Sequence, residues 1–254
     1  LKIGCPKEIK PQEFRVGMTP NAAREAVNAG HTVLIETNAG VGAGFVDADS
    51  VAAGAKIVAT AEEVFAAAEM IVKVKEPQPV ERARLRPGQV LFTYLHLAPD
   101  PEQTADLLAS GATCIAYETV TDDRGGLPLL APMSEVAGRL APQVGAWTLQ
   151  KANGGRGVLM GGVPGVLPAK VLVIGGGVVG THAAKISAGM GADVTVLDRS
   201  VNRLRYLDDV FGGQFKCGYA DAATTIELAR QADMIIGAVL IPGAAAPKLI
   251  SRAQ

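Results

Sequence analysis

The sequence predicts an α/β protein with two domains, each built on a parallel β-sheet. Short β-branched runs alternate with alanine-rich, helix-forming stretches along most of the 254 residues, a pattern typical of strands joined by crossover helices. A turn-rich stretch, "TDDRGGLPLLAP" at 121–132, interrupts this alternation near the middle of the chain. We therefore expect a first domain over 1–128 and a second over 129–254.

The first half is expected to contain five strands separated by capped helices. Thr19 can cap a helix whose first position is Pro20 and whose end is marked by Gly30. Two further helices are expected at 60–69 and 100–111, each opened by a capping residue or proline. The expected strands are Lys2–Cys5, Thr32–Glu36, 70–74, 90–94 and 113–117.

Three further segments are interpreted separately. The glycine cluster "NAGVGAGF" at 38–45 is expected to be a structural loop, because Phe45 stands where a third close-packing glycine would be needed. At 134–152 the sequence predicts a bridging helix capped by Ser134 and kinked or split by Pro142. The segment at 153–170 is too rich in glycine and proline for regular structure.

The most informative motif lies at the start of the second domain. The strand "KVLVI" is followed by Gly175, Gly177 and Gly180 in the register G-x-G-x-x-G, and a helix ending at Gly191 comes next. In such a motif the first glycine makes the turn, the second lets the backbone approach a pyrophosphate, and the third packs helix against strand. The free N–H groups of the helix then face the anion.

An acid at the end of the next strand strengthens this interpretation. Asp198 ends "ADVTVLD" and lies 23 positions beyond Gly175, close to the offset at which an acid binds the adenosine ribose. A carboxylate there repels a 2′-phosphate, which favours NAD over NADP, although Arg199 and Arg203 lie near enough to weaken the preference. A glycine turn without a ligand is the alternative.

The rest of the second domain continues the alternation. After Asp198 we expect a helix at 202–212, a short strand within 213–220, a helix at 224–232 and a fourth strand at 233–241. Together with the first strand these make one half of a doubly wound, Rossmann-like sheet. Because the sequence ends at Gln254, we expect this NAD-binding domain to be incomplete at its C-terminal end.

Composition limits the classes of partner. The formal net charge is −1, aromatic residues make up 4%, and no basic stripe is present, so we expect no nucleic-acid partner. The cysteines Cys5, Cys114 and Cys217 are odd in number and far apart, which favours a reduced, cytoplasmic setting and no metal site. The longest apolar stretch is short and broken by glycine and proline, so no membrane role is expected.

Three segments carry a resemblance to a known family. These are "CPKEIKPQEFRVGMTP", "GVLMGGVPGVLPAKVLVIGGGVVGTHAAK" and "VTVLDRSVNRLRYLDD". They resemble bacterial alanine dehydrogenase, a relative of the soluble NAD-binding subunit of proton-translocating transhydrogenase, and the similarity covers the whole chain. The resemblance implies reversible oxidative deamination of L-alanine to pyruvate and ammonia, with hydride passing to NAD. It also implies a homo-oligomer, specifically a hexamer.

The resemblance implies three catalytic residues in the first domain. Arg15 and Lys75 would hold the substrate carboxylate and the adjacent oxygen, and the planar guanidinium of Arg15 suits a carboxylate. Strand alternation in "IVKVKEP" is expected to place Lys73 and Lys75 on one face, although a solvated strand-end lysine is the commoner case. His96, where a strand gives way to a proline-rich loop, would be the acid/base group, since histidine titrates near neutral pH.

The remaining implied contacts are to the cofactor. Ser134 would contact it from the bridging helix, and Arg203 would reach its adenosine end. Val178 and Val179 would contact the dinucleotide through their backbone, while Val239 and Leu240 would line the nicotinamide side.

The main departure from the family is at the C-terminal side. The resemblance implies a catalytic aspartate and further strands beyond the fourth strand of the second domain, and the sequence does not reach them. Three possibilities stay open here: a part of an ordinary alanine dehydrogenase, a short NAD-binding product without catalysis, or a transhydrogenase-type subunit that passes hydride to another partner.

Overall fold

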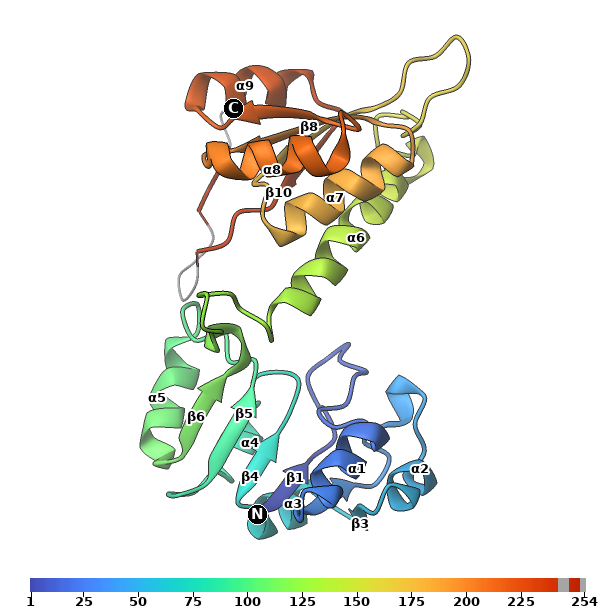
Figure 1. Cartoon of the computed structure of the whole chain (residues 1–254). Helices are drawn as coiled ribbons and strands as arrows, with labels where there is room; N and C mark the ends of the chain where they lie inside the picture. Colours follow the sequence, from blue (N-terminus) through green and yellow to red (C-terminus); the bar gives the residue numbers. More distant parts are fainter. Residues whose placement is uncertain (242–246, 252–254) are drawn as a thin grey trace. The chain divides into compact units, whose positions relative to one another are not determined.

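The computed structural model describes residues 1–241 and 247–251 and divides into two compact units, Leu1–Leu127 and Pro128–Gln254. Each unit has a parallel sheet of its own (Figure 1). The six-stranded sheet of the first unit and the four-stranded sheet of the second contain only parallel pairs among the described strands. The predicted α/β class with two parallel sheets is confirmed.

The first unit has the complete strand order of a doubly wound sheet. The order β3-β2-β1-β4-β5-β6 means that the chain starts at the centre, builds one side, and then returns to build the other. The direction of building reverses between β1 and β4, and ligands of open α/β sheets bind outside the carboxyl ends of the strands at that switch point. The strands are β1 Lys2–Cys5, β2 Thr32–Glu36, β3 Lys56–Val58, β4 Met70–Val72, β5 Val90–Thr93 and β6 Thr113–Ala116.

The helices of this unit begin where the capping residues predict. The side chains of Thr19, Thr60 and Asp100 accept hydrogen bonds from backbone N–H groups in the first turns of α1, α3 and α5. The short elements α2, β3 and α4 were not expected, because three to six residues are too few for a periodic pattern. The helices are α1 Pro20–Asn28, α2 Asp47–Ala52, α3 Ala61–Ala67, α4 Pro79–Arg82 and α5 Pro101–Ser110.

Alternating residues of the first sheet pack on its two faces. Ile3, Val33 and Ile35 belong to one buried cluster, while Ile71 and Leu91 belong to another that includes helix α3. Gly4 lets α3 approach the sheet closely, because a Cβ there would lie 2.7 Å from the side chains of Val64 and Ala68. The predicted loop at 38–45 forms turns and one short 3₁₀ turn.

The four described strands of the second unit have the same order as the first four strands of the first unit. Its order β10-β7-β8-β9 again has the first strand beside the fourth, so the switch point lies between β7 and β10. The expected strands and helices are all present, with end points shifted by a few residues. They are α6 Ala131–Thr148, β7 Lys170–Ile174, α7 Val178–Gly189, β8 Asp193–Asp198, α8 Val201–Phe211, β9 Lys216–Tyr219, α9 Ala222–Gln231 and β10 Met234–Gly237.

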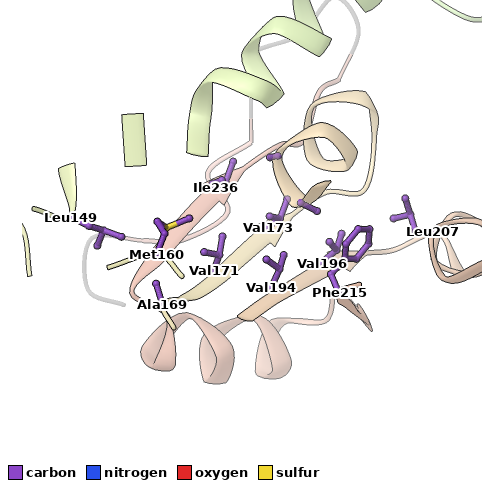
Figure 2. Packing of buried hydrophobic residues seen from close by; sticks show 12 residues of the cluster. Leu149, Met160, Ala169, Val171, Val173, Val194, Val196, Leu207, Phe215 and Ile236 are labelled. Carbon is purple, nitrogen blue, oxygen red and sulfur yellow. The ribbon is translucent and has the colours of Figure 1, made fainter. Parts of the chain in front are cut away.

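The core of the second unit is built on β7 and β8. Figure 2 shows Val171, Val173, Val194 and Val196 on one face of the sheet, packed with residues such as Phe215. The intervening residues, including Leu172 and Leu197, are buried on the opposite face. Burial on both faces explains why these strands are continuous apolar runs.

Helix α6 differs from its prediction in two ways. It begins at Ala131 with Leu130 as N-cap, so Ser134 lies inside the helix and is not its cap. Pro142 is accommodated inside one continuous helix, and the predicted split is wrong. Tertiary packing explains the difference, because α6 lies closely against α7: a Cβ at Gly138 would collide with the backbone oxygen of Val179.

Within residues 1–241 and 247–251, no helix has both the length and the apolar character needed to cross a bilayer.

Candidate functional site

The glycine turn after β7 has the geometry of a phosphate cradle. Gly175 has φ +107°, and a Cβ there would lie 2.6 Å from the backbone oxygen of Ala238 at the end of β10. A Cβ at Gly180 would collide with the backbone oxygen of Gly175. Gly177 instead faces open space: apart from its chain neighbours and its own helix backbone, no atom of the described residues lies within 4 Å of its Cβ position. Two glycines therefore serve the fold, and the third leaves room beside the backbone.

Helix α7 begins directly at this open position. Gly177 is its N-cap, and Val178 and Val179 form its first turn. The N–H groups of a first helical turn have no carbonyl partner within their own helix, and the helix dipole places positive charge at this end. The turn can therefore bind a phosphate group through backbone N–H groups.

Two charged side chains hold the glycine turn in place. The carboxylate of Asp198 accepts hydrogen bonds from the backbone N–H groups of Gly176 and Ser200, both at 2.7 Å. The guanidinium of Arg203 donates to the backbone oxygen of Gly176 at 2.6 Å and to the Thr181 hydroxyl at 2.7 Å. Asp198 lies at the end of β8, as predicted, and its carboxylate fixes the turn there.

A pocket of about 480 Å³ lies at the carboxyl ends of β7 and β8. This volume is that of a small-molecule site. Among the predicted residues, Gly175, Asp198 and Val239 line it, whereas Leu240 is 57% exposed and Ser134 lies on α6, and neither is among the described lining residues. Other lining residues include Arg199, Ala220, Thr225, Ile226 and Leu249.

In the first unit, Arg15 lies in the segment between β1 and α1 and is held by Glu13. Its Nε and Nη2 donate to the two oxygens of the Glu13 carboxylate at 2.8 and 2.6 Å. The backbone N–H of Arg15 donates to the same carboxylate at 2.9 Å. Hydrogen bonding to Glu13 raises the pKa of Arg15, and the bonds from Arg15 lower the pKa of Glu13. Glu13 therefore orients the guanidinium.

Lys75 lies three residues beyond the end of β4. The strand ends at Val72, so the expectation that Lys73 and Lys75 share a strand face is wrong. Lys73 is 1% exposed, whereas Lys75 is partly exposed. Burial lowers the pKa of the Lys75 ammonium, and the positive charges of Lys10 and Arg15 lower it further. Lys75 thus belongs to a cluster of cations at the carboxyl edge of the sheet.

Beneath this edge lies a buried ionic cluster that the sequence did not indicate. The Lys73 ammonium lies 2.7 Å from the Glu81 carboxylate and 3.2 Å from that of Glu8. Glu8 also accepts the backbone N–H of Val74 at 2.6 Å, which joins the segments after β1 and β4. Burial raises the pKa of Glu8, and the charge of Lys73 opposes this rise. The cluster therefore connects the segment after β1 with the segment after β4, the two strands on either side of the switch point.

His96 follows β5 in a constrained backbone conformation. Its φ is +50°, in the left-handed region, and the Glu118 carboxylate accepts the N–H groups of His96 at 2.6 Å and Leu95 at 3.1 Å. The ring stacks on Tyr94 with a centroid distance of 6.0 Å. Burial lowers the pKa of His96; Glu118 raises it, while Lys75 and Lys10 lower it further.

The structure therefore brings Arg15, Lys75 and His96 to one edge of the first sheet. Each follows the carboxyl end of β1, β4 or β5, on either side of the switch point. The charge of Arg15 lowers the pKa of Lys75, and the charge of Lys75 lowers the pKa of His96. The arrangement can bind a small carboxylate through its cations and exchange a proton with a neighbouring group of the same ligand or with water through His96. Among residues 1–241 and 247–251, no group of three or more histidine, cysteine, aspartate or glutamate residues is placed to hold a metal ion.

Sequence reasoning missed the residues that support this edge. These residues are Lys10, Glu13, Glu76 and Glu118. A signal was present for two of them, because Glu76 directly follows Lys75, and Glu118 comes two residues after the end of β6. Position just beyond a parallel strand would have marked both as candidates.

The fold and the glycine turn define a two-unit α/β protein of the Rossmann type. Models of the alanine dehydrogenase/PNT family match both units, the N-terminal domain over residues 4–137 and the C-terminal domain over residues 141–254. The chain belongs to this family.

Individual relatives agree with this assignment. An alanine dehydrogenase from Halomonas elongata is 59% identical over 252 residues, which are 99% of this chain and 68% of that protein. A solved L-alanine dehydrogenase structure is similar with a TM-score of 0.91 and 53% identity, over 100% of this chain and 70% of that chain. A transhydrogenase from Sinorhizobium meliloti has a TM-score of 0.80 at 25% identity, over 100% of this chain and 74% of that chain. Family and fold together imply a nicotinamide cofactor.

Proposed function

We propose that this protein catalyses the reversible, NAD-dependent oxidative deamination of L-alanine to pyruvate and ammonia, with 1–128 as the substrate domain and 129–254 as the NAD-binding domain. The observation that carries the proposal is the meeting of Arg15, Lys75 and His96 at the switch point of the first sheet. The 59% identity to an alanine dehydrogenase supports the choice of substrate.

The residues of the second unit fit NAD. The pyrophosphate would lie on the N–H groups of Val178 and Val179, beside the open position at Gly177. Asp198 would bind the adenosine ribose, and its negative charge would reject a 2′-phosphate. Arg203 would act near the adenosine end, while Ser134, Val239 and Leu240 are the further contacts that the family resemblance implies. When bound, NAD supplies the acceptor for the hydride.

The first unit would bind the amino acid and move its protons. Arg15, oriented by Glu13, would pair with the substrate carboxylate, and Lys75 would hold the adjacent oxygen. Alanine first loses one proton from its ammonium group, and loss of hydride from Cα of the resulting amine removes two electrons and leaves an iminium cation. Water adds to that carbon with loss of a proton, and return of a proton to nitrogen expels ammonia and leaves pyruvate. His96 would take the proton released by the attacking water and return it to the leaving nitrogen.

The assay follows NADH absorbance in both directions, with the product of the complete reading frame that contains these residues. L-Alanine with NAD should produce NADH, and pyruvate with ammonium should consume it. Absence of turnover in both directions would overturn the proposal.

A variant of His96 tests its role. His96→Ala should lower kcat by at least about a hundredfold, because general acid–base catalysis typically contributes that much. NADH binding, measured by fluorescence titration, should be unchanged, since His96 belongs to the first unit. Loss of NADH binding in this variant would show a structural role instead.

A transhydrogenase-type role is not favoured. The solved transhydrogenase is 25% identical to this chain, whereas the solved L-alanine dehydrogenase is 53% identical. In the assay, hydride transfer between nicotinamide nucleotides without use of L-alanine would support the transhydrogenase role.

We further propose a cytoplasmic location and a homo-oligomer, specifically a hexamer. Both rest on the family resemblance. Light scattering coupled to size exclusion tests the hexamer, and fractionation of the source cells tests the location.

A further inference from the structure

A carboxylate that the sequence did not single out faces the ring of His96. We propose that Glu76 is a positioning residue, which sets the tautomer and the basicity of His96 through Nδ1. The inference deepens the proposed function, since it rests on His96 being the acid/base group.

The geometry places Glu76 between a cation and the imidazole. Its Oε1 pairs with the Lys10 ammonium, and its Oε2 lies 3.5 Å from Nδ1 of His96. That Oε2 atom is buried and accepts no hydrogen bond from any described residue, although the carboxylate side chain is 15% exposed. A buried carboxylate oxygen that accepts no hydrogen bond destabilises the folded protein. A proton on Nδ1 of His96 would supply the missing donor after a small approach of the ring, so we infer that the proton is favoured on that nitrogen.

The backbone around His96 restricts where its ring can lie. Glu118 holds the N–H groups of Leu95 and His96, the φ of His96 is +50°, and Tyr94 stacks on the ring. Glu118 therefore bonds to the main chain and acts on the ring only through its charge, whereas Glu76 faces the ring nitrogen Nδ1. We infer that the contact at Nδ1 decides the tautomer.

The chemical consequence follows from the two nitrogens of imidazole. In the neutral ring, one nitrogen carries the proton and the other can accept one. A carboxylate at Nδ1 favours the proton there, which leaves Nε2 as the acceptor for the proton of the attacking water. Once Nε2 is protonated, the negative charge of Glu76 stabilises the cation.

All charges near the ring act on its pKa. Burial lowers it, Glu118 raises it, and Lys75 and Lys10 lower it. Because the Glu76 carboxylate faces Nδ1, we infer that its charge opposes the two lysines, and Lys10 partly neutralises Glu76 because the two are paired. Removal of Glu76 and removal of Lys10 should therefore shift the pKa of His96 in opposite directions.

A direct titration tests this inference without any turnover. The sequence has three histidines, so nitrogen chemical shifts of ¹⁵N-histidine protein resolve His96, with His96→Ala for assignment. In wild type the neutral ring should carry its proton on Nδ1. Glu76→Gln should lower the pKa of His96 and reduce the share of this tautomer, and Lys10→Met should raise that pKa. An unchanged tautomer and pKa in Glu76→Gln, or shifts of the same sign in both variants, would overturn the inference.

Steady-state kinetics give a second test of the role of Glu76. Glu76→Gln should reduce kcat/KM for L-alanine by about tenfold, less than loss of the histidine itself, and leave NADH affinity unchanged. Glu102→Gln is the control, because its carboxylate is 80% exposed and pairs with Arg82 on the α4–α5 side of the unit. If wild type shows no turnover, the proposed function fails, while the titration still decides the role of Glu76.

Discussion

The two sheets share a strand order but differ at the point where their chains reverse. In the first unit, β1 and β4 are followed by the charged stretches "PKE" and "KVKE". In the second unit, β7 is followed by three glycines, and β10 is followed by Ala238 and Val239. The switch point of the first unit therefore exposes charged side chains to a ligand, whereas that of the second unit exposes backbone groups.

The difference shows two physical ways to prepare the same edge for a ligand. The first unit buries ions and must pair them, as Lys73 is paired with Glu8 and Glu81. The second unit has glycines at this edge. Gly175 and Gly180 allow backbone atoms to pack closely, and the free N–H groups at the start of α7 lie beside the open position at Gly177. A small carboxylate matches the first edge, and a phosphate chain matches the second.

The largest expected effect comes from breaking the buried ionic cluster. Lys73→Ala leaves the carboxylates of Glu8 and Glu81 buried without their shared cation. We expect the free energy of unfolding of the first unit to fall by about 3 to 5 kcal/mol, as measured by urea denaturation.

The matched control is a lysine of the same unit. Lys56 is exposed on β3, and Lys56→Ala should change stability by less than about 0.5 kcal/mol. Equal stability of Lys73→Ala and wild type would mean that the cluster does not hold the switch point together.

The second-largest effect is expected at the glycine turn after β7. Gly180→Ala places a Cβ against the backbone oxygen of Gly175, so we expect a loss of about 3 kcal/mol and no measurable NADH binding by calorimetry. Gly189→Ala, on the same helix with nothing described within 4 Å, should instead add about 0.5 to 1 kcal/mol. Normal NADH affinity in Gly180→Ala would contradict the close packing of helix and strand.

How much the sequence could predict also differs between the two edges. The glycine turn, Asp198 and both flanking strands were predicted in place, because backbone geometry restricts residue type at each position. Glycine at φ +107° and an acid at a fixed offset are local signals.

The first edge was predicted only in part, because its organisation depends on long-range pairs. Lys73 and Glu8 are 65 residues apart, and the sequence did not reveal that they would meet. Because β4 ends at Val72, both Lys73 and Lys75 lie beyond the strand, and one is buried while the other is partly exposed, although both lie in one alternating run. Pairing partners follow from the strand order β1-β4-β5, which a sequence pattern alone does not specify.

A third prediction concerns cofactor choice at the second edge. Asp198→Ala removes the charge expected to reject a 2′-phosphate, so the preference for NAD over NADP in kcat/KM should fall by about tenfold. Asp193→Ala, at the other end of β8 and paired with Lys216, should leave the preference unchanged. An unchanged preference for NAD over NADP in Asp198→Ala would mean that this carboxylate only holds the glycine turn.

The smallest effect is a pH shift at the first edge. Glu118→Gln keeps an oxygen that can accept the N–H groups of Leu95 and His96 but removes a negative charge that raises the pKa of His96. The pKa of His96, already lowered by burial, should fall further, so its unprotonated form persists to lower pH. The acidic limb of kcat/KM for L-alanine should therefore move to lower pH, with less than about a threefold change at the optimum. A limb that moves to higher pH would show that the charge of Glu118 does not act on His96 as inferred.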